Sequence, residues 1–234
     1  MSIDSLCYNY TMFYFDKVNG KKVLKSTILD GVNHFFTTRG YELSDVVSGE
    51  IVHPTQTHTS HIEIAQVGKS NYPDTDGMIL TNKEQTLYLN FADCTPLIFY
   101  DFDKKIGAVS HAGWRGTAGM IGVKTVEKMA LDFGSKPENI KCAIGPAIGF
   151  CCYNVGEDVH RQLMATIKNQ EGLFAIRNGE LFVDLKNINK RQLEEAGLKE
   201  IDVCPYCTVC NNDLFYSYRK ENGTKDRHSA VLKL

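Results

Sequence analysis

The apolar residues of this chain recur in short runs bounded by Gly, Pro, Asn or Asp, and this pattern predicts a fold dominated by β-strands. The runs are rich in Val, Ile, Leu, Phe and Tyr, as strands usually are. The predicted strands are residues 61–67, 76–81, 86–93, 96–101, 105–112, 141–146, 214–219 and 229–234.

Three segments carry apolar residues at helical spacing instead. The first predicted helix covers residues 117–133, and Gly134 is placed to cap its end. The second begins near Glu157 and frays by Gln170, with acidic residues in its first turn. The third starts after Asp184, a plausible N-cap, and stops before residue 198.

The organisation of these elements predicts one domain that spans residues 1–234. No repeat, low-complexity tract or Pro/Ser-rich linker separates them. Strands and helices are mixed without strict alternation, which favours a layered α+β fold over a doubly wound sheet.

The charge balance narrows the range of partners. Lys and Arg total 26 against 28 Asp and Glu, so no basic face is offered to nucleic acid or to anionic lipid. The N-terminus lacks the pattern of a signal peptide, and no window is apolar enough for a membrane helix. We therefore expect a cytoplasmic protein whose eight cysteines are reduced.

Reactive side chains stand at the ends of the predicted strands. Cys94 follows one apolar run and His111 ends another, while His53, His58 and His61 crowd into the nine residues "HPTQTHTSH". One Cys and two His are a zinc ligand set that leaves a fourth position open, and an open position indicates catalysis through an activated water. The ordinary alternative for each histidine is a polar loop.

Three polar residues adjoin the candidate ligands in sequence, namely Gln56, Asp93 and Arg115. They could orient the ligands or bind substrate, because metal-bound imidazoles and thiolates need hydrogen-bonding partners. The alternative is that Asp93 caps a turn and Arg115 makes a surface ion pair.

A rival cluster lies in "CPYCTVC", where Cys204, Cys207 and Cys210 have a spacing that can bind zinc or an iron–sulfur cluster. No fourth Cys or His follows it promptly. Cys151 and Cys152 are adjacent, and on a strand their side chains would point apart, so we interpret them as packing or turn residues.

Three further arginines, Arg39, Arg219 and Arg227, follow or flank predicted strands. Their guanidinium groups suit phosphate or carboxylate, although a surface salt bridge is the ordinary use.

Taken in order, the motifs "QTH", "DGMILT", "ADCTPLIFYD", "SHAGWRGT", "IGPAIGFCCYNVG" and "FYSYR" resemble the YfiH family, also called the multicopper polyphenol oxidase or laccase-domain family. The resemblance runs from about residue 33 to the end. It implies a layered α/β/β/α sandwich of mixed sheets, with His58, Cys94 and His111 as metal ligands. By the same likeness His53 and His61 are bystanders, and the "CPYCTVC" segment is not the family's metal site.

The resemblance also implies an activity, that of a zinc-dependent purine nucleoside enzyme. Such an enzyme cleaves adenosine, inosine, guanosine or methylthioadenosine with phosphate and deaminates adenosine as a second reaction. Holding the phosphate is a natural task for Arg39 or Arg115. Asp93, Arg115 and Gln56 are the expected catalytic residues, and the chain is expected to be a monomer or homodimer.

Two other functions remain open at this point. The older family label makes a copper-dependent phenol oxidase one alternative, although laccase chemistry needs several coppers and this chain has seven histidines. The other alternative is a family member whose metal only stabilises the fold and that has no turnover. The chain also departs from the family pattern between Arg39 and Gln56, where an insertion is missing or shortened, so part of the usual pocket wall is altered.

Overall fold

The first of two large sheets contains both ends of the described chain. The computed structural model describes residues 12–40 and 49–234. Six strands form this sheet in the order β1-β2-β3-β15-β7-β4, all antiparallel except the β4–β7 pair. They are β1 (Phe13–Val18), β2 (Lys21–Ser26), β3 (Asn33–Thr37), β15 (His228–Lys233), β7 (Gln85–Phe91) and β4 (Glu50–Val52).

The second large sheet faces the first and carries most of the predicted strands. Its order is β14-β10-β8-β9-β6-β5, with parallel pairing at both edges and antiparallel pairing between. The strands are β14 (Glu200–Val203), β10 (Ile140–Ile144), β8 (Thr95–Asp101), β9 (Ile106–Ala112), β6 (Gly77–Leu80) and β5 (Ile62–Ile64).

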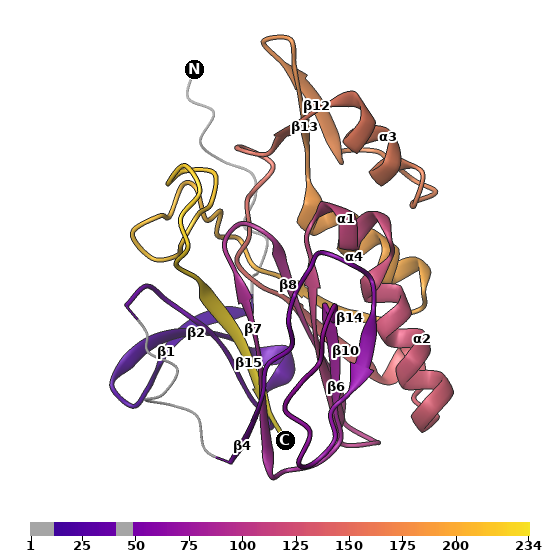
Figure 1. The fold of residues 1–234 in the computed structure, drawn as a ribbon. Coiled ribbons are helices and arrows are strands. Elements are labelled where there is room, and N and C mark those ends of the chain that lie inside the picture. Colours follow the sequence, from indigo (N-terminus) through magenta and orange to yellow (C-terminus); the bar gives the residue numbers. More distant parts are fainter. Residues whose placement is uncertain (1–11, 41–48) are drawn as a thin grey trace.

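Helices cover the outer face of the second sheet, and a small third sheet of order β11-β13-β12, with one further helix packed against it, lies beyond the end of the second sheet (Figure 1). The helices are α1 (Trp114–Ala118), α2 (Ile121–Phe133), α3 (Glu157–Met164) and α4 (Leu185–Glu195), with short 3-10 turns η1 (Thr27–Leu29) and η3 (Pro137–Asn139). The small sheet consists of β11 (Asn154–Val155), β12 (Phe174–Arg177) and β13 (Glu180–Val183).

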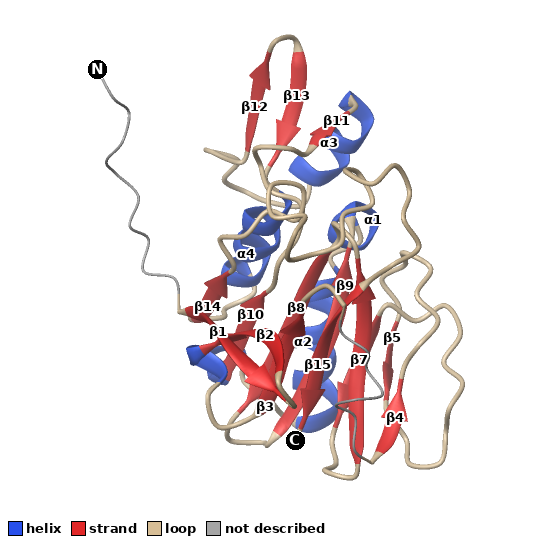
Figure 2. Cartoon of the chain, turned by 90° about the vertical axis from the view of Figure 1, so that its left-hand side faces the viewer, coloured by secondary structure: helices blue, strands red, loops and turns tan. Residues whose placement is uncertain are grey.

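Strand β8 shows how the layers are held together. All seven of its residues are buried, because one face packs on the first sheet and the other on the helices. Ile98 and Tyr100 belong to the core between the sheets, whereas Leu97 and Phe99 belong to the core beneath α2 and α4. The predicted layered fold of mixed sheets is confirmed, and Figure 2 shows its two sheets with the helices behind them.

The pairing of β8 with β9 places the candidate site. Pro96 lies opposite His111 and Thr95 opposite Ala112, so Cys94 at the start of β8 adjoins the end of β9. His111 and Val109 are two residues apart on β9, so their side chains point to the same face of the sheet, and Val109 belongs to the core between the sheets. Its side chain therefore points into the space between the two sheets, where its ring centroid is 5.3 Å from that of Phe91.

The first predicted helix is two helices in the structure. It breaks at Gly119 and Met120, where Met120 takes a left-handed backbone with φ 56°. A Cβ on Gly119 would lie 3.0 Å from the Ser60 Cβ, so the break coincides with a close approach of the loop before β5. The Gly134 end and the Asp184 cap are confirmed, and Asp184 accepts a hydrogen bond from the Asn187 backbone.

The prediction of a strand at residues 214–219 is wrong, because this segment forms turns. Its backbone N–H groups donate within the turns or to side-chain carboxylates instead of to a neighbouring strand, and those of Leu214 and Phe215 donate to Asn211 O. Ser217 donates to Glu221 Oε1 at 2.9 Å, and Arg219 donates to Asp93 Oδ2 at 2.7 Å. Phe215 remains fully buried, which explains the apolar pattern.

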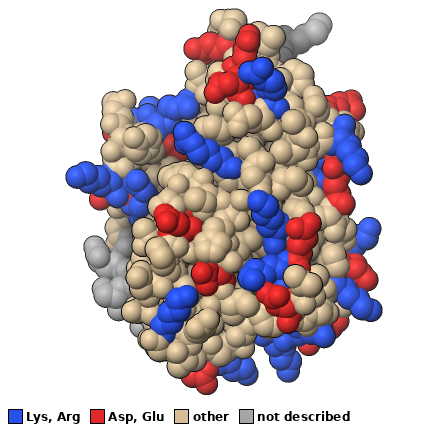
Figure 3. Space-filling view, turned by 45° about the vertical axis from the view of Figure 1, so that its right-hand side comes forward, with Lys and Arg blue, Asp and Glu red and all other residues tan. Residues whose placement is uncertain are grey.

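Some predictions concern residues outside the described ranges. Cys7, one of the eight cysteines expected to be reduced, lies there, as do residues 41–48, half of the segment in which the chain departs from the family pattern. Within the described ranges no helix combines the length and apolarity needed to cross a bilayer. Lys and Arg are interspersed with Asp and Glu on the face drawn in Figure 3.

Candidate metal site and cavity

Three side chains from distant parts of the chain converge at one end of the space between the sheets. They are His58 from the loop after β4, Cys94 between β7 and β8, and His111 at the end of β9. One nitrogen or sulfur atom of each lies within 4.8 Å of the others. This is the trio that the family resemblance implies, and its donor atoms suit zinc.

The backbone around this trio is specialised for close approach. His58 has φ 64° and Asp93, which precedes Cys94, has φ 83°, both in the left-handed region. Gly113 leaves room on the other side, because a Cβ there would lie 2.9 Å from the Cys94 sulfur and 3.3 Å from the His58 ring.

Asp76, which sequence reasoning missed, anchors the trio. It is fully buried just before β6, and its Oδ1 lies 2.7 Å from His111 Nδ1. Its carboxylate also accepts hydrogen bonds from the backbone N–H groups of Thr57, His58 and Thr59. One carboxylate therefore positions two of the three candidate ligands.

The electrostatics of Asp76 follow from these contacts. Burial alone would raise its pKa, but the hydrogen bonds from His111 and from the Thr59 backbone outweigh it and hold the pKa at about 2. Asp76 is consequently ionised throughout the neutral range. The motif "DGMILT" contained this residue, but nothing in the sequence indicated which side chain it would face.

Cys94 and His111 shift each other's pKa values. Burial raises the pKa of Cys94, but the charge on His111 and hydrogen bonds from His111 and His58 lower it to about 6. Burial lowers the pKa of His111, but Cys94 and Asp76 raise it to about 9. The sulfur is therefore a thiolate at neutral pH, the form that binds a metal.

The trio opens onto a cavity of about 920 Å³, a size typical of small-molecule sites. Aromatic rings of Trp114, Tyr153 and Tyr218 line it together with apolar Ile148 and Val159. Its charged lining includes three arginines, Arg115, Arg219 and Arg227, and one acid, Asp93. The cavity thus combines flat apolar surfaces with positive charge.

Gln56 and Asp93 lie in this cavity but their polar groups are engaged by the protein. The Gln56 amide donates to Asn90 O at 3.0 Å and accepts from Asn90 N at 2.8 Å, which ties the His58 loop to β7. Asp93 accepts from Thr208 Oγ1 at 2.5 Å and from the Arg219 backbone. Both residues position neighbouring parts of the site.

The two arginines expected to bind substrate are placed differently. Arg115 lines the cavity with an exposed guanidinium that lies 4.4 Å from the Trp114 ring. Arg39 is not among the described residues that line it. Its guanidinium pairs with Glu221 at 2.5 Å, donates to Asn212 O at 2.6 Å and lies over the Tyr216 ring.

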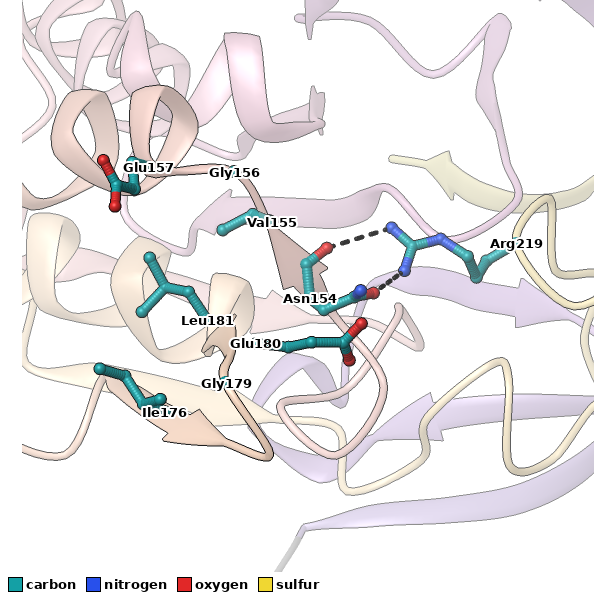
Figure 4. A pocket seen from close by; sticks show the side chains of 9 residues that line it. All are labelled: Asn154, Val155, Gly156, Glu157, Ile176, Gly179, Glu180, Leu181 and Arg219. Atoms are coloured by element: carbon teal, nitrogen blue, oxygen red, sulfur yellow. Dashed lines mark hydrogen bonds between the residues drawn. The ribbon is translucent and has the colours of Figure 1, made fainter.

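Arg219 is one of the residues that line the cavity, and Figure 4 shows its contact with Asn154. Its guanidinium donates to the side chain and backbone oxygens of Asn154 at the start of β11. Beyond this contact lies a second hollow of about 570 Å³ between β11 and the β12–β13 hairpin, lined also by Glu157 and Glu180.

Two residues lie in the cavity that sequence reasoning set aside or missed. His53, expected to be a bystander, lines the wall and stacks on Tyr88 with ring centroids 4.2 Å apart. Tyr153 lines the wall next to the cysteines of "FCCYNVG". His61 is half-exposed beside Glu63.

The interpretation of Cys151 and Cys152 as turn residues is confirmed, but their side chains do not point apart as they would on a strand. Both occupy a turn, and their sulfurs gather with those of Cys207 and Cys210 within 4.8 Å of one another. Cys204, the first cysteine of "CPYCTVC", is buried in the core between the sheets instead.

Most of the chain matches a known protein family. Residues 37–234 match the family model described as multi-copper polyphenol oxidoreductase laccase. The chain belongs to this family. The resemblance drawn from the motifs is thereby confirmed, and the laccase family name implies a metal, although it does not identify which one.

Individual proteins are similar to this chain over much of its length. Purine nucleoside phosphorylase YlmD of Bacillus subtilis (strain 168) is 36% identical over 161 residues, which cover 68% of this chain and 58% of that protein, less than two thirds of its length. Adenosine deaminase RL5 from an unknown prokaryotic organism is 29% identical over 195 residues, 77% of this chain and 72% of that protein. The crystal structure of YlmD from Geobacillus stearothermophilus superposes with a TM-score of 0.85 at 28% identity, covering 95% of this chain and 98% of that one.

Proposed function

We propose that this protein is a zinc-dependent purine nucleoside enzyme that cleaves adenosine, inosine, guanosine or methylthioadenosine with phosphate and also deaminates adenosine. The observation that carries the proposal is the convergence of His58, Cys94 and His111 at a cavity that also holds three arginines and aromatic rings. The names of the relatives, a purine nucleoside phosphorylase and an adenosine deaminase, support the same class of reaction.

The donor set fits zinc. His58, Cys94 and His111 would hold the ion, and three protein ligands leave a position for substrate or water. Bound there, zinc would supply Lewis-acid polarisation and a lowered pKa for water. Asp76 accepts a hydrogen bond from Nδ1–H of His111, which leaves Nε2 of that ring for the metal.

We assign phosphate binding to Arg115. Its guanidinium lines the cavity and lies over the Trp114 ring, and its N–H groups suit an anion such as phosphate. Arg219 and Arg227 line the same cavity and add positive charge. Arg39 pairs with Glu221, so we assign it the positioning of the turn segment that carries Arg219.

The purine is held by the aromatic part of the cavity. Trp114 and Tyr153 line this part, and flat apolar rings of this kind stack well on heterocycles. Burial, followed by the nearby Cys94 charge, raises the pKa of Tyr153. Its hydroxyl consequently keeps its proton at neutral pH and can donate a hydrogen bond to a substrate oxygen or ring nitrogen.

The experiment measures products from the zinc-loaded protein. Incubation with adenosine and phosphate should yield adenine and ribose 1-phosphate, with inosine as a second product. Cys94→Ala should abolish both, whereas Cys142→Ala, which removes a thiol buried in the core beneath the helices and outside the cavity lining, should retain them. Full turnover by a folded Cys94→Ala protein would overturn the proposal.

The family description favours one competing function, copper-dependent oxidation of phenols. Elemental analysis of protein purified without chelators separates the two, because the proposal expects zinc at the trio. Oxygen uptake with a phenolic substrate by copper-loaded protein, together with inactivity on nucleosides, would establish the competing function instead.

A further inference from the structure

Four cysteine sulfurs gather at a second place, apart from the trio. Cys151 and Cys152 lie in one turn, and Cys207 and Cys210 lie in another turn more than 50 residues further along the chain. All four sulfurs are within 4.8 Å of one another. Cys210 Sγ is 3.6 Å from that of Cys151 and 3.5 Å from that of Cys152.

These separations match a single tetrahedral metal ion. A zinc–thiolate bond is about 2.3 Å long, so the four sulfurs of a tetrahedral site lie about 3.8 Å apart. An iron–sulfur cluster distributes its cysteines over separate iron atoms, which demands a wider spread of sulfurs. A disulfide needs sulfurs at about 2.05 Å, much closer than those measured here.

The surrounding backbone is arranged to support a thiolate at Cys207. Gly149 N–H donates to its sulfur at 3.1 Å, and the backbone N–H groups of Val209 and Cys210 are also hydrogen-bonded to it. Such N–H···S contacts are the partners that metal-bound thiolates use.

The two turns are also packed closely against each other. A parallel bridge joins Ala147 to Cys207, and Thr208 N donates to Ala147 O at 3.0 Å. A Cβ at Gly149 would lie 2.9 Å from the Cys207 Cβ and 3.2 Å from the Cys151 sulfur. Glycine is therefore required for the turns to meet at this distance.

We propose that Cys151, Cys152, Cys207 and Cys210 bind one structural zinc ion. Four thiolates close the coordination shell, so this ion has no open position for substrate and acts as a clamp between the two turns.

The clamp supports the wall of the cavity. Both turns hold Asp93, the residue before Cys94: Ile148 N donates to Asp93 O at 2.9 Å, and Thr208 Oγ1 donates to its carboxylate. Tyr153, which lines the cavity, directly follows Cys152. Loss of the clamp should therefore loosen this wall while leaving the trio's ligands in place.

The first test counts zinc in the full-length protein purified under reducing conditions without chelators. We expect about two zinc ions per chain, one at each site. The double variant Cys151→Ser/Cys210→Ser should retain about one. The double variant His58→Ala/His111→Ala should also retain about one, now bound by the four cysteines. Cys142→Ala should retain both. If the His58→Ala/His111→Ala protein retains this zinc, the four-cysteine site is supported. That result does not depend on whether the wild-type protein cleaves nucleosides.

A second measurement covers the case in which the serine variant fails to fold. Zinc X-ray absorption of the folded His58→Ala/His111→Ala protein should show four sulfur neighbours at about 2.3 Å and no nitrogen. Three results would overturn the proposal: absence of zinc from that protein, nitrogen or oxygen ligands on its zinc, or disulfides among the four cysteines in freshly purified wild type.

Discussion

Asp76 Oδ1 accepts a hydrogen bond from His111 Nδ1 across 2.7 Å, and both side chains are buried. The contact fixes the ring orientation of one candidate ligand, and the same carboxylate holds the backbone of another, His58. The precision of the candidate metal site therefore depends on a residue that binds no metal itself.

Replacing Asp76 by Asn should weaken zinc binding at the trio by about 10- to 100-fold, because the amide cannot accept all the hydrogen bonds that the carboxylate accepts. Competition with a chromophoric chelator measures the affinity. Asp74→Asn is the matched control, since Asp74 is exposed two residues away and its left-handed backbone tolerates Asn. Equal affinities for the two variants would contradict the role given to Asp76.

Gly113→Ala should reduce zinc affinity at the trio by about tenfold while leaving the fold intact. The added Cβ would come within 2.9 Å of the Cys94 sulfur, so the ligand must move. Gly156→Ala serves as the control, because the nearest atom to its Cβ is the mobile end of the Asp158 side chain. Chelator competition on both variants checks the difference, and an unperturbed affinity in Gly113→Ala would show that the site can relax around the methyl group.

Arg115→Gln should raise the KM for phosphate by about 10- to 100-fold, the loss expected for charge-assisted hydrogen bonds. Deamination of adenosine uses no phosphate, so its rate should change little. Arg191→Gln is the control, because Arg191 lies on α4 and its guanidinium donates a hydrogen bond to Asn169 O. A normal KM for phosphate in Arg115→Gln would show that Arg219 or Arg227 binds the phosphate instead.

His228 should make the protein sensitive to mild acid. It is fully buried between Phe91 and Phe215, and burial, with smaller effects of Arg227 and Arg39, lowers its pKa from 6.5 to about 4. The unfolded chain binds a proton at the ordinary pKa and the folded chain only at the lower one. Stability therefore falls as pH drops from 6.5 to 4, by ~3 kcal/mol from this residue.

Urea unfolding at several pH values tests this pH dependence. His228→Phe should flatten the loss of unfolding free energy between pH 6.5 and 4, because its side chain takes up no proton. His61→Gln, at a half-exposed position, should retain the wild-type slope. The same slope in all three proteins would assign the acid sensitivity to other groups.

Sequence periodicity located the central strands and helices because local pattern decides them. Strands β7, β8 and β9 lie within or next to their predicted ranges, since each is a continuous apolar run buried on at least one face. Residues 214–219 have an equally strong apolar pattern but form turns, in which Asn211 O, Glu221 and Asp93 accept hydrogen bonds from their backbone N–H groups. That outcome depends on acceptors outside the strand-like run.

The sequence by itself determined the layered fold class, through its apolar periods, and it contained the motifs whose family likeness singled out His58, Cys94 and His111. Only the tertiary structure decided that Asp76 orients His111, that Glu221 engages Arg39, and that two cysteine pairs meet at one point. The physical reason is sequence distance. A buried hydrogen bond or a metal-sized cluster is made by groups that the sheet register brings together, and no local pattern along the chain records that register.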